Sequence, residues 1–567
     1  MLAYASDMAA PAADPRPSPP RCAPPWSRRD TIALGVIFAV ALALRLLHLE
    51  EIRANDPYFA NPSLDPRFHH EAALQISGGD FFTASVALLA SIYPYFLASI
   101  YALAGPSIAA AKAAQALLGA VSCALIYALA HRVFSRRVAA VSGAIAASYS
   151  VMIFYGGTLT IVNVLLPLTL LLLLCVDRAM RRPGAAIWAL AGLLVGATTL
   201  GRPTALLYAP LLLPWMLYDL RGSVPLQRRL LLALAFGGGL AVAIVPLTAR
   251  TVLMNSDWRG GVNFYIGNNP EAIGVFKAPR LVENVRLDHP IEMRRAYEAV
   301  AEAKLGRDIG PGEVSSFWMR EGLRFVRGEP LAWLRLELRK LGLFFNAYEP
   351  WNLRSHSVSK SFSRVLRLPL FTLGVVVPLA FLGAFASRRD WRRLAPLYLM
   401  VGTYLIIAML FFVASRYRLP MVPVLILFAG RGLVFLFDAA RARDARTLAA
   451  ALLALALVAV PVHWPIVPDR LSGAYYNLGN RYKALGAWDL AIESYRESIV
   501  RNRRSFSAWN NLALVLEAAG REAEAIEVWQ AIHGWATAPN REVYRERAVR
   551  HLQQLGAPPP AEALAAP

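Results

Sequence analysis

The chain has 567 residues, of which 56% are hydrophobic and 17% are charged, and its formal net charge is +21. Soluble domains contain more charge and fewer apolar residues, so this composition excludes an ordinary soluble protein and predicts that lipid surrounds most of the chain. The positive charge does not indicate a nucleic-acid partner, because the arginines form short clusters between apolar runs and are not gathered on one face or in one tail.

Residues 1–27 are rich in proline and alanine, which predicts a disordered cytoplasmic tail. Apolar runs long enough to cross a bilayer follow it, and short arginine clusters place their connections in the cytoplasm by the positive-inside rule. The sequence therefore predicts an all-α, polytopic membrane protein of about eleven spans, at residues 31–49, 107–131, 138–156, 159–177, 184–200, 203–219, 230–249, 367–387, 395–413, 419–438 and 447–466.

This topology predicts two polar loops on the exoplasmic side of a transmembrane domain, 28–466. The first loop covers residues 50–106, and within it residues 85–104 are expected to lie along the membrane interface as short helices, broken at Tyr93-Pro94. The second loop covers residues 250–366 and includes an amphipathic helical pattern from Ser315 to Phe345. The odd number of spans places the C-terminus outside; in a bacterium the membrane is then the inner membrane and the tail is periplasmic.

Residues 470–556 differ from the rest, because they combine helical periodicity with ordinary polarity. Six positions there recur 34 residues later with similar side chains: Leu478, Gly479, Tyr482, Gly486, Ala491 and Tyr495 are matched by Leu512, Ala513, Leu516, Gly520, Ala525 and Trp529. This period resembles the tetratricopeptide repeat. Since stacks of such repeats bind peptides on a concave surface, the tail predicts a protein partner or acceptor.

The first loop offers a candidate catalytic acid, Asp65, which could accept a proton from a nucleophile. The alternative is a helix cap, because Asp followed by Pro is a common helix start. His69 could assist proton transfer. The alternative for His69 is a solvated histidine in a loop.

Several exoplasmic cations are not explained by the positive-inside rule. The pair in Arg416-Tyr417-Arg418 stands at a span end, where it could bind a lipid-linked phosphate, and the alternative is snorkelling towards lipid headgroups. Lys340 and Arg202 are further candidates of this kind. The segment from Gly260 to Pro270 contains amides and an aromatic ring suited to sugar hydroxyls, although an ordinary turn would explain it equally well; its candidate residues are Asn263, Tyr265, Asn268 and Asn269.

Five segments in this order, "LDPRFHHEAALQISGGD", "YPYFLASIYALAG", "GRPTALL", "VNFYIGNNPEAIG" and "FFVASRYRLPMVPVL", closely resemble bacterial membrane glycosyltransferases of the C-type superfamily. That group includes the protein O-mannosyltransferases and the aminoarabinose transferases of lipid A, and some bacterial members carry tetratricopeptide repeats. The resemblance covers about residues 31–440. It implies inverting transfer of a sugar from a polyprenyl-phosphate donor to a protein or envelope acceptor on the exoplasmic face.

The resemblance also implies roles for single residues. Asp65 matches the general base of the family, while Lys340, Arg416 and Arg418, with Arg202 as a less direct match, correspond to cations near the donor phosphate. Glu349 lies in a loop that approaches the active site in similar proteins, although a surface acid before Pro350 is the alternative. This mechanism requires neither a metal nor another cofactor.

The sequence departs from the family where similar proteins have a glutamate at the start of the fourth span. Here the segment "FYGGTLTIVNVL" offers Thr160, Val162 and Asn163, which argues against a two-carboxylate mechanism. Three other functions compete with the glycosyltransferase reading: an O-antigen-ligase-like or oligosaccharyltransferase enzyme, an envelope transporter, and a scaffold acting through the tail.

Overall fold

The computed structural model describes residues 25–81, 92–253, 258–279, 281, 290–467, 471–536 and 541–558. Within these ranges the chain forms helices and no β-strand, which confirms the predicted all-α class. The predicted disordered tail lies almost entirely outside the described residues, as do residues 85–91 of the predicted interfacial stretch.

Seven helices among the described residues are long and apolar enough to cross a membrane, so the chain is an integral membrane protein. They are α1 (Arg28–Asn55), α5 (Ile108–Val133), α8 (Val162–Arg181), α11 (Leu226–Leu253), α18 (Trp391–Leu410), α20 (Val422–Arg441) and α21 (Ala445–His463). Two shorter apolar helices, α9 (Ala185–Gly201) and α17 (Leu373–Ala386), match two further predicted spans.

The two remaining predicted spans are interrupted helices. The run at 138–156 is divided into α6 (Arg136–Ala147) and α7 (Ser150–Gly156), because its main chain pairs with Phe371: Phe371 N–H donates to Ser148 O at 3.1 Å, and Ser150 N–H donates to Phe371 O at 3.0 Å. The run at 203–219 begins as a 3₁₀ turn, η1 (Pro203–Leu207), and continues as α10 (Tyr208–Asp219). Every predicted span therefore coincides with helical structure.

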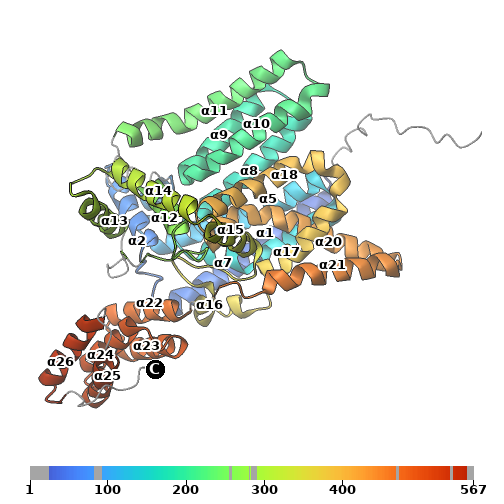
Figure 1. The fold of residues 1–567 in the computed structure, drawn as a ribbon. Coiled ribbons are helices and arrows are strands. Elements are labelled where there is room, and N and C mark those ends of the chain that lie inside the picture. Colours follow the sequence, from blue (N-terminus) through green and yellow to red (C-terminus); the bar gives the residue numbers. More distant parts are fainter. Residues whose placement is uncertain are drawn as a thin grey trace, which may run out of the picture.

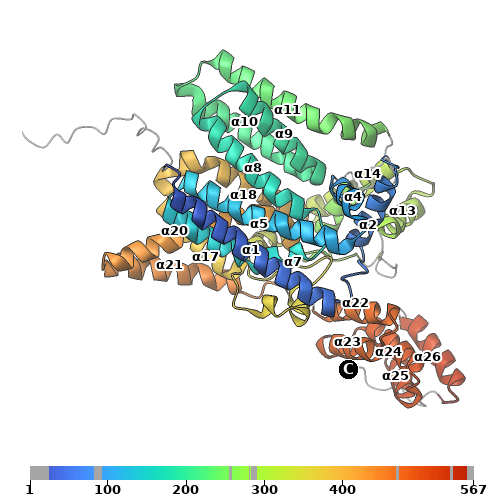
Figure 2. The same ribbon diagram turned by 180° about the vertical axis from the view of Figure 1, so that it is seen from behind.

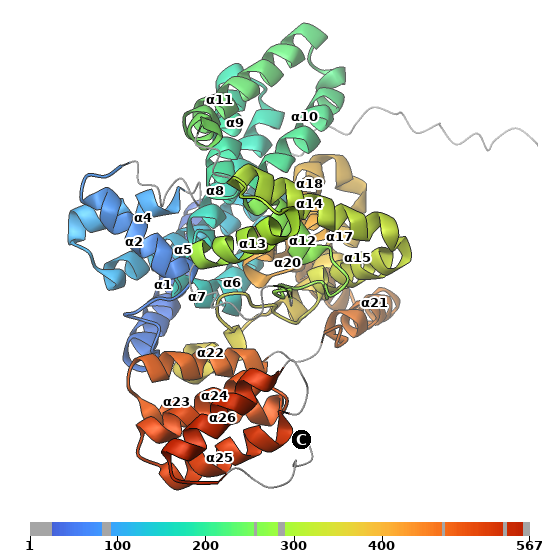
Figure 3. The ribbon, with the colours of Figure 1, turned by 60° about the vertical axis from the view of Figure 1, so that its left-hand side comes forward.

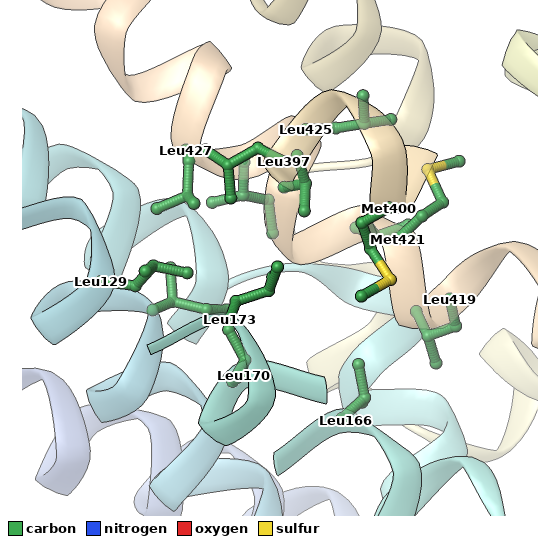
Figure 4. Close-up of a cluster of buried hydrophobic side chains, with 14 of the residues drawn as sticks. Leu129, Leu166, Leu170, Leu173, Leu397, Met400, Leu419, Met421, Leu425 and Leu427 are labelled. Carbon is green, nitrogen blue, oxygen red and sulfur yellow. The ribbon is translucent and has the colours of Figure 1, made fainter. Parts of the chain in front are cut away.

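Apolar side chains from α5, α8, α18 and α20 fill the centre of the bundle, where leucines and methionines of these helices interdigitate (Figure 4). Glycines allow other helices to approach more closely. A Cβ on Gly192 of α9 would lie 1.9 Å from the carbonyl oxygen of Phe236 in α11, and one on Gly239 would lie 1.9 Å from that of Ala189. Close backbone contact of this kind is typical of helices that pack in lipid.

The polar loops form their own helices, which gather at one end of the spanning bundle (Figures 1 and 3). A helix, α4, begins at Tyr93, and Pro94 stands in its first turn, where proline needs no hydrogen-bond partner. The loop helices are α2 (Asp65–Ser77), α4 (Tyr93–Ala104), α12 (Arg259–Gly267), α13 (Pro290–Leu305), α14 (Pro311–Gly328) and α15 (Pro330–Phe345). Short turns complete the connections: η2 (Leu220–Gly222), α16 (His356–Ser359), η4 (Lys360–Phe362), η5 (Val365–Arg367), η6 (Arg388–Asp390), α19 (Ser415–Arg418) and η7 (Leu419–Met421).

The C-terminal tail is a stack of five helices that pack against one another in chain order. They are α22 (Leu471–Ala484), α23 (Trp488–Arg501), α24 (Phe506–Ala518), α25 (Glu522–Trp535) and α26 (Glu542–Gln554). The repeated residues Tyr495 and Trp529 are both fully buried in the tail core. Assignment of this stack to the tetratricopeptide class stays a prediction, as do the domain boundaries.

The tail contacts the membrane domain near the first loop, at the end of the bundle that carries the loop helices (Figure 2). The Tyr58 hydroxyl donates to Asn477 O at 2.8 Å, and Arg481 Nε donates to Pro57 O at 3.1 Å. Because Pro57 and Tyr58 precede Asp65 by only a few residues, the tail touches the segment that carries the candidate base.

Candidate active site

The backbone just before Asp65 is held in an unusual conformation. Helix α2 begins at Asp65 itself, and the preceding Leu64 has φ 58° and ψ −140°. Residues with a side chain rarely adopt positive φ, and such strain persists only where the surroundings impose it. This conformation sets the direction in which the Asp65 side chain leaves the main chain.

The Asp65 carboxylate pairs with an arginine and does not cap a helix. Its Oδ2 accepts a hydrogen bond from Arg416 Nη1 at 2.7 Å, and no hydrogen bond from Asp65 to the first turn of α2 is found. The capping alternative is therefore wrong. Burial opposes ionisation of Asp65, but Arg416, and then His69 and Arg259, outweigh it and hold the pKa of this carboxyl below its usual range.

Cations surround this carboxylate. The Tyr417 ring lies 4.1 Å from the Arg202 guanidinium carbon and 5.2 Å from that of Arg416, so both arginines contact the same aromatic ring. Arg202 Nη1 and Arg416 Nε are buried and have no hydrogen-bond partner within the described part of the chain. Buried donors without partners are costly, so these two N–H groups are available to an anionic ligand.

Arg259, at the start of α12, is a site residue that the sequence analysis missed. Its charge acts on both Asp65 and His69. Its position could have indicated it, because Arg259 is also an arginine in a loop that is predicted to be exoplasmic and that the positive-inside rule does not explain. It precedes the glycine–asparagine segment directly.

His69 is buried, which corrects the alternative of a solvated histidine: its residue is 6% exposed. The ring lies edge-to-face on Tyr93, with centroids 4.9 Å apart. Burial lowers the pKa of His69 to about 4 in spite of the nearby Asp65 carboxylate, so the imidazole is neutral at pH 7. Its Nδ1 is buried without a partner among the described residues and can contact a ligand hydroxyl.

Lys340 is fully buried, and its three N–H groups are already used. Lys340 Nζ donates to Glu337 Oε1 at 2.7 Å, to Met409 O at 2.8 Å and to Asn268 Oδ1 at 3.1 Å. These contacts join α15 to α12 and α18. The geometry thus gives Lys340 a structural role in place of the phosphate contact that the sequence predicts.

The two terminal nitrogens of Arg418 are likewise committed to the protein, whereas its Nε is buried without a partner among the described residues. Its Nη1 donates to the carbonyls of Leu343 and Asn346, and its Nη2 donates to Tyr348 O and to Glu349 Oε2, each of the last two at 2.8 Å. Arg418 is 2% exposed, so its charge is compensated inside the fold by Glu349. Glu349 is therefore the half-buried ion-pair partner of Arg418, which argues against the alternative of a surface acid.

Most of the segment from Gly260 to Pro270 forms helix α12. The sequence analysis left open whether this segment is a sugar-binding loop or an ordinary turn. Asn268 and Asn269 are buried and donate to main-chain carbonyls, and Asn268 also accepts from Trp333. Its glycines serve packing, since a Cβ on Gly267 would lie 1.9 Å from Phe411 O. Asn263 and Tyr265 are half-buried, so they are the members of this set with surface left for a ligand.

Asn163 occupies the region where similar proteins have a glutamate, and it stabilises a turn. Its Nδ2 donates to the carbonyls of Tyr155, Thr158 and Thr160 at 2.9 to 3.2 Å. Among the described residues no group of three or more His, Cys, Asp or Glu side chains could hold a metal ion. The site thus consists of one carboxylate and several arginines.

Part of the chain matches a known family. Residues 90–248 match the family model described as dolichyl-phosphate-mannose-protein mannosyltransferase. The resemblance predicted from the motifs, to membrane glycosyltransferases of the C-type superfamily, is thereby confirmed. Among curated proteins, none matches the chain.

Solved structures of two kinds are similar to this chain. ArnT from Cupriavidus metallidurans in the apo state is 15% identical, with a TM-score of 0.42, and the match covers 94% of this chain and 90% of that one. ArnT bound to undecaprenyl phosphate is 18% identical, with a TM-score of 0.32 and coverage of 72% and 79%. The oligosaccharyltransferase AglB from Archaeoglobus fulgidus, in complex with an inhibitory peptide and a dolichol-phosphate, is 14% identical, with a TM-score of 0.41 and coverage of 95% and 61%. The chain thus spans less than two thirds of the length of the archaeal enzyme.

Proposed function

We propose that this protein transfers a sugar from a polyprenyl-phosphate donor to an acceptor hydroxyl on the exoplasmic face, with Asp65 as the general base. The observation that carries the proposal is the Asp65–Arg416 pair beside Arg202 and Tyr417. One carboxylate can remove a proton, and adjacent arginines with unused N–H groups can bind a phosphate. ArnT, which is similar to this chain, has been solved with undecaprenyl phosphate bound, and this lipid belongs to the proposed class of donor carriers.

In the proposed reaction the acceptor oxygen forms a bond with the anomeric carbon, and its proton passes to Asp65. The bond between the anomeric carbon and the phosphate oxygen breaks, and its electron pair leaves with polyprenyl phosphate. Arg416 and Arg202 stabilise the charge that develops on this leaving oxygen. Attack opposite the leaving group inverts the anomeric centre.

Donor binding also prepares the base. Arg416 lowers the pKa of Asp65, so a carboxylate engaged by Arg416 is a weak base. A donor phosphate that competes for Arg416 would release Asp65, and burial would then raise its pKa. Lys340 and Arg418 act as positioning residues, because they fix α15 and the loop at Glu349 around the site.

The test is transfer from a panel of radiolabelled polyprenyl-phosphate sugars by the purified protein, comparing wild type with Asp65→Asn. Asparagine keeps the size of the side chain and removes its basicity. The matched control is Glu71→Gln, which changes a carboxylate on the same helix that pairs with exposed Arg67. We expect Asp65→Asn to lower kcat by 10² to 10⁴-fold and Glu71→Gln to leave it unchanged. Equal activity of wild type and Asp65→Asn would refute the assignment of the base.

A further inference from the structure

A hollow lies beside the first loop. Ser63 and Pro66, on either side of the Leu64–Asp65 step, form one wall, and Lys112, Thr158 and Arg354 contribute polar groups to the others. The remaining lining residues are Tyr58, Pro62, Gly157 and Leu159. None of the arginines around Asp65 lines this hollow, so it is separate from the proposed donor-phosphate site.

Lys112, in the second turn of α5, has an ammonium group that no acid contacts directly. The residue is 2% exposed; its Nζ donates to Phe59 O at 3.0 Å and lies 3.8 Å from the Phe59 ring centroid. Within the described part of the chain, no carboxylate lies within 4.0 Å of this ammonium. An uncompensated buried charge is expensive, and a buried cation normally has an anionic partner.

Arg354 is a second cation in the lining, and it forms an ion pair with Asp56. Its Nη2 donates to Asp56 Oδ2 at 2.6 Å, and its guanidinium carbon lies 4.8 Å from the Tyr58 ring. Asp56 contacts Arg354 directly and its charge also acts on Lys112, so two cations share one carboxylate. The lining of the hollow thus has a net positive charge.

Thr158 gives an independent indication of a ligand. The residue is 4% exposed, and its Oγ1 is buried with no hydrogen-bond partner among the described residues. A hydroxyl deprived of both water and protein partners costs free energy that a bound acceptor atom would recover. Lys112, Arg354 and Thr158 therefore line one hollow from three different segments.

From these contacts we propose that the hollow binds an oxyanion group, a phosphate or a carboxylate, carried by the acceptor. Lys112 supplies positive charge, and Thr158 donates its hydroxyl. Because Ser63 and Pro66 flank Asp65 in the chain, an anion held here would place the attached hydroxyl near the base. That this anion belongs to the acceptor rests on the proposed function, whereas anion binding itself does not.

The tail contacts one residue in the wall of this hollow. Tyr58 lines it and donates its hydroxyl to Asn477 O of α22, while Arg481 of the same helix donates to Pro57 O. A shift of α22 would therefore move a residue in the wall of the proposed anion site. This contact connects the tail with acceptor binding without requiring the tail to bind a peptide.

The test is equilibrium dialysis of the purified full-length protein with radiolabelled inorganic phosphate or acetate at constant ionic strength. The variants are Lys112→Met, which keeps side-chain length and removes the charge, and Thr158→Val, which keeps the shape and removes the hydroxyl. Lys360→Met, an exposed lysine beyond Arg354, is the matched control. Arg416→Met removes a cation of the proposed donor site. Comparison with Lys112→Met therefore shows which of the two sites binds the anion.

We expect Lys112→Met and Thr158→Val to lose one phosphate-binding site that Lys360→Met and Arg416→Met retain. If acetate also binds to the wild type and is lost in Lys112→Met and Thr158→Val, the site accepts carboxylates as well as phosphates. If acetate does not bind to the wild type, the site is specific for phosphates. In the transfer assay Lys112→Met should raise the KM for the acceptor about tenfold and change kcat less. Unchanged binding of both anions by folded Lys112→Met and Thr158→Val would overturn the proposal, even if sugar transfer by the wild type succeeds.

Discussion

Replacement of Lys340 by methionine distinguishes a structural role from a phosphate-binding role. The substitution keeps side-chain length but removes three hydrogen bonds of a fully buried ammonium, to Glu337, Asn268 and Met409 O. It leaves Glu337 without its cation. Loss of one partner of a buried ion pair costs about 3–5 kcal/mol, a large fraction of the stability of a domain.

The pH dependence of this loss has a definite sign. Burial raises the pKa of Glu337 even though Lys340 opposes the shift, so without Lys340 the carboxyl takes up a proton more readily. At low pH the neutral acid is tolerated and the destabilisation is smaller. At high pH an ionised, unpaired carboxylate is buried and the destabilisation is larger.

The measurement is the free energy of unfolding of the purified protein in an SDS titration, followed by circular dichroism at several pH values. The control is the double variant Lys340→Met with Glu337→Gln, which removes both charges and should recover most of the loss, since an apolar or neutral replacement of a buried pair is often close to neutral. Suppose instead that Lys340→Met unfolds like wild type but no longer binds donor. The structural role would then be wrong, and the phosphate contact predicted from the sequence would be right.

Three further predictions concern the site and the tail. In Arg416→Met, burial acts on Asp65 without its cation, so the acidic limb of the kcat/KM profile should move to higher pH; an unmoved limb would exclude Asp65 as the titrating base. Leu64→Gly should keep transfer activity, because glycine adopts φ 58° freely, whereas Leu64→Val should lose about 1–3 kcal/mol in thermal unfolding; equal stability of the two would contradict backbone strain at this position. Tyr58→Phe removes the hydrogen bond to Asn477 O, worth about 1 kcal/mol, so limited proteolysis should release the tail several-fold faster; an unchanged rate would show that this contact does not hold the tail.

The membrane architecture could be predicted because lipid leaves the chain few options. Within hydrocarbon every main-chain polar group must be paired inside its own segment, so each spanning segment appears as one apolar helical run. The breaks in these runs were not predicted. Helices α6 and α7 are divided because Phe371, more than 200 residues away in the chain, pairs with the main chain at Ser148 and Ser150, and periodicity carries no information about such a distant partner.

The site was predicted in part, for a related reason. Sequence position identifies a cation in an exoplasmic loop but not its partner, so Arg416 and Arg418 looked equivalent. Their surroundings differ: Arg416 pairs with Asp65, whereas the terminal nitrogens of Arg418 donate to four main-chain carbonyls and to Glu349. Asn268 shows the same limit, because an amide that could bind a sugar can equally bind other parts of the protein. Here it accepts from Lys340 Nζ and donates to Leu410 O at the end of α18.

Competition for Arg416 gives the proposed reaction an order of events. A sugar phosphodiester carries one negative charge, as Asp65 does, so the donor must bind several arginines together to draw Arg416 away from the carboxylate; Arg202, which contacts the same Tyr417 ring, is placed to contribute. When the sugar leaves, the phosphate gains a second charge while Asp65 becomes neutral by taking the proton, and both changes strengthen the hold of phosphate on Arg416. Departure of polyprenyl phosphate returns Arg416 to Asp65, where its charge lowers the carboxyl pKa and expels the proton. The same ion pair that weakens the base before donor binding therefore regenerates it after product release.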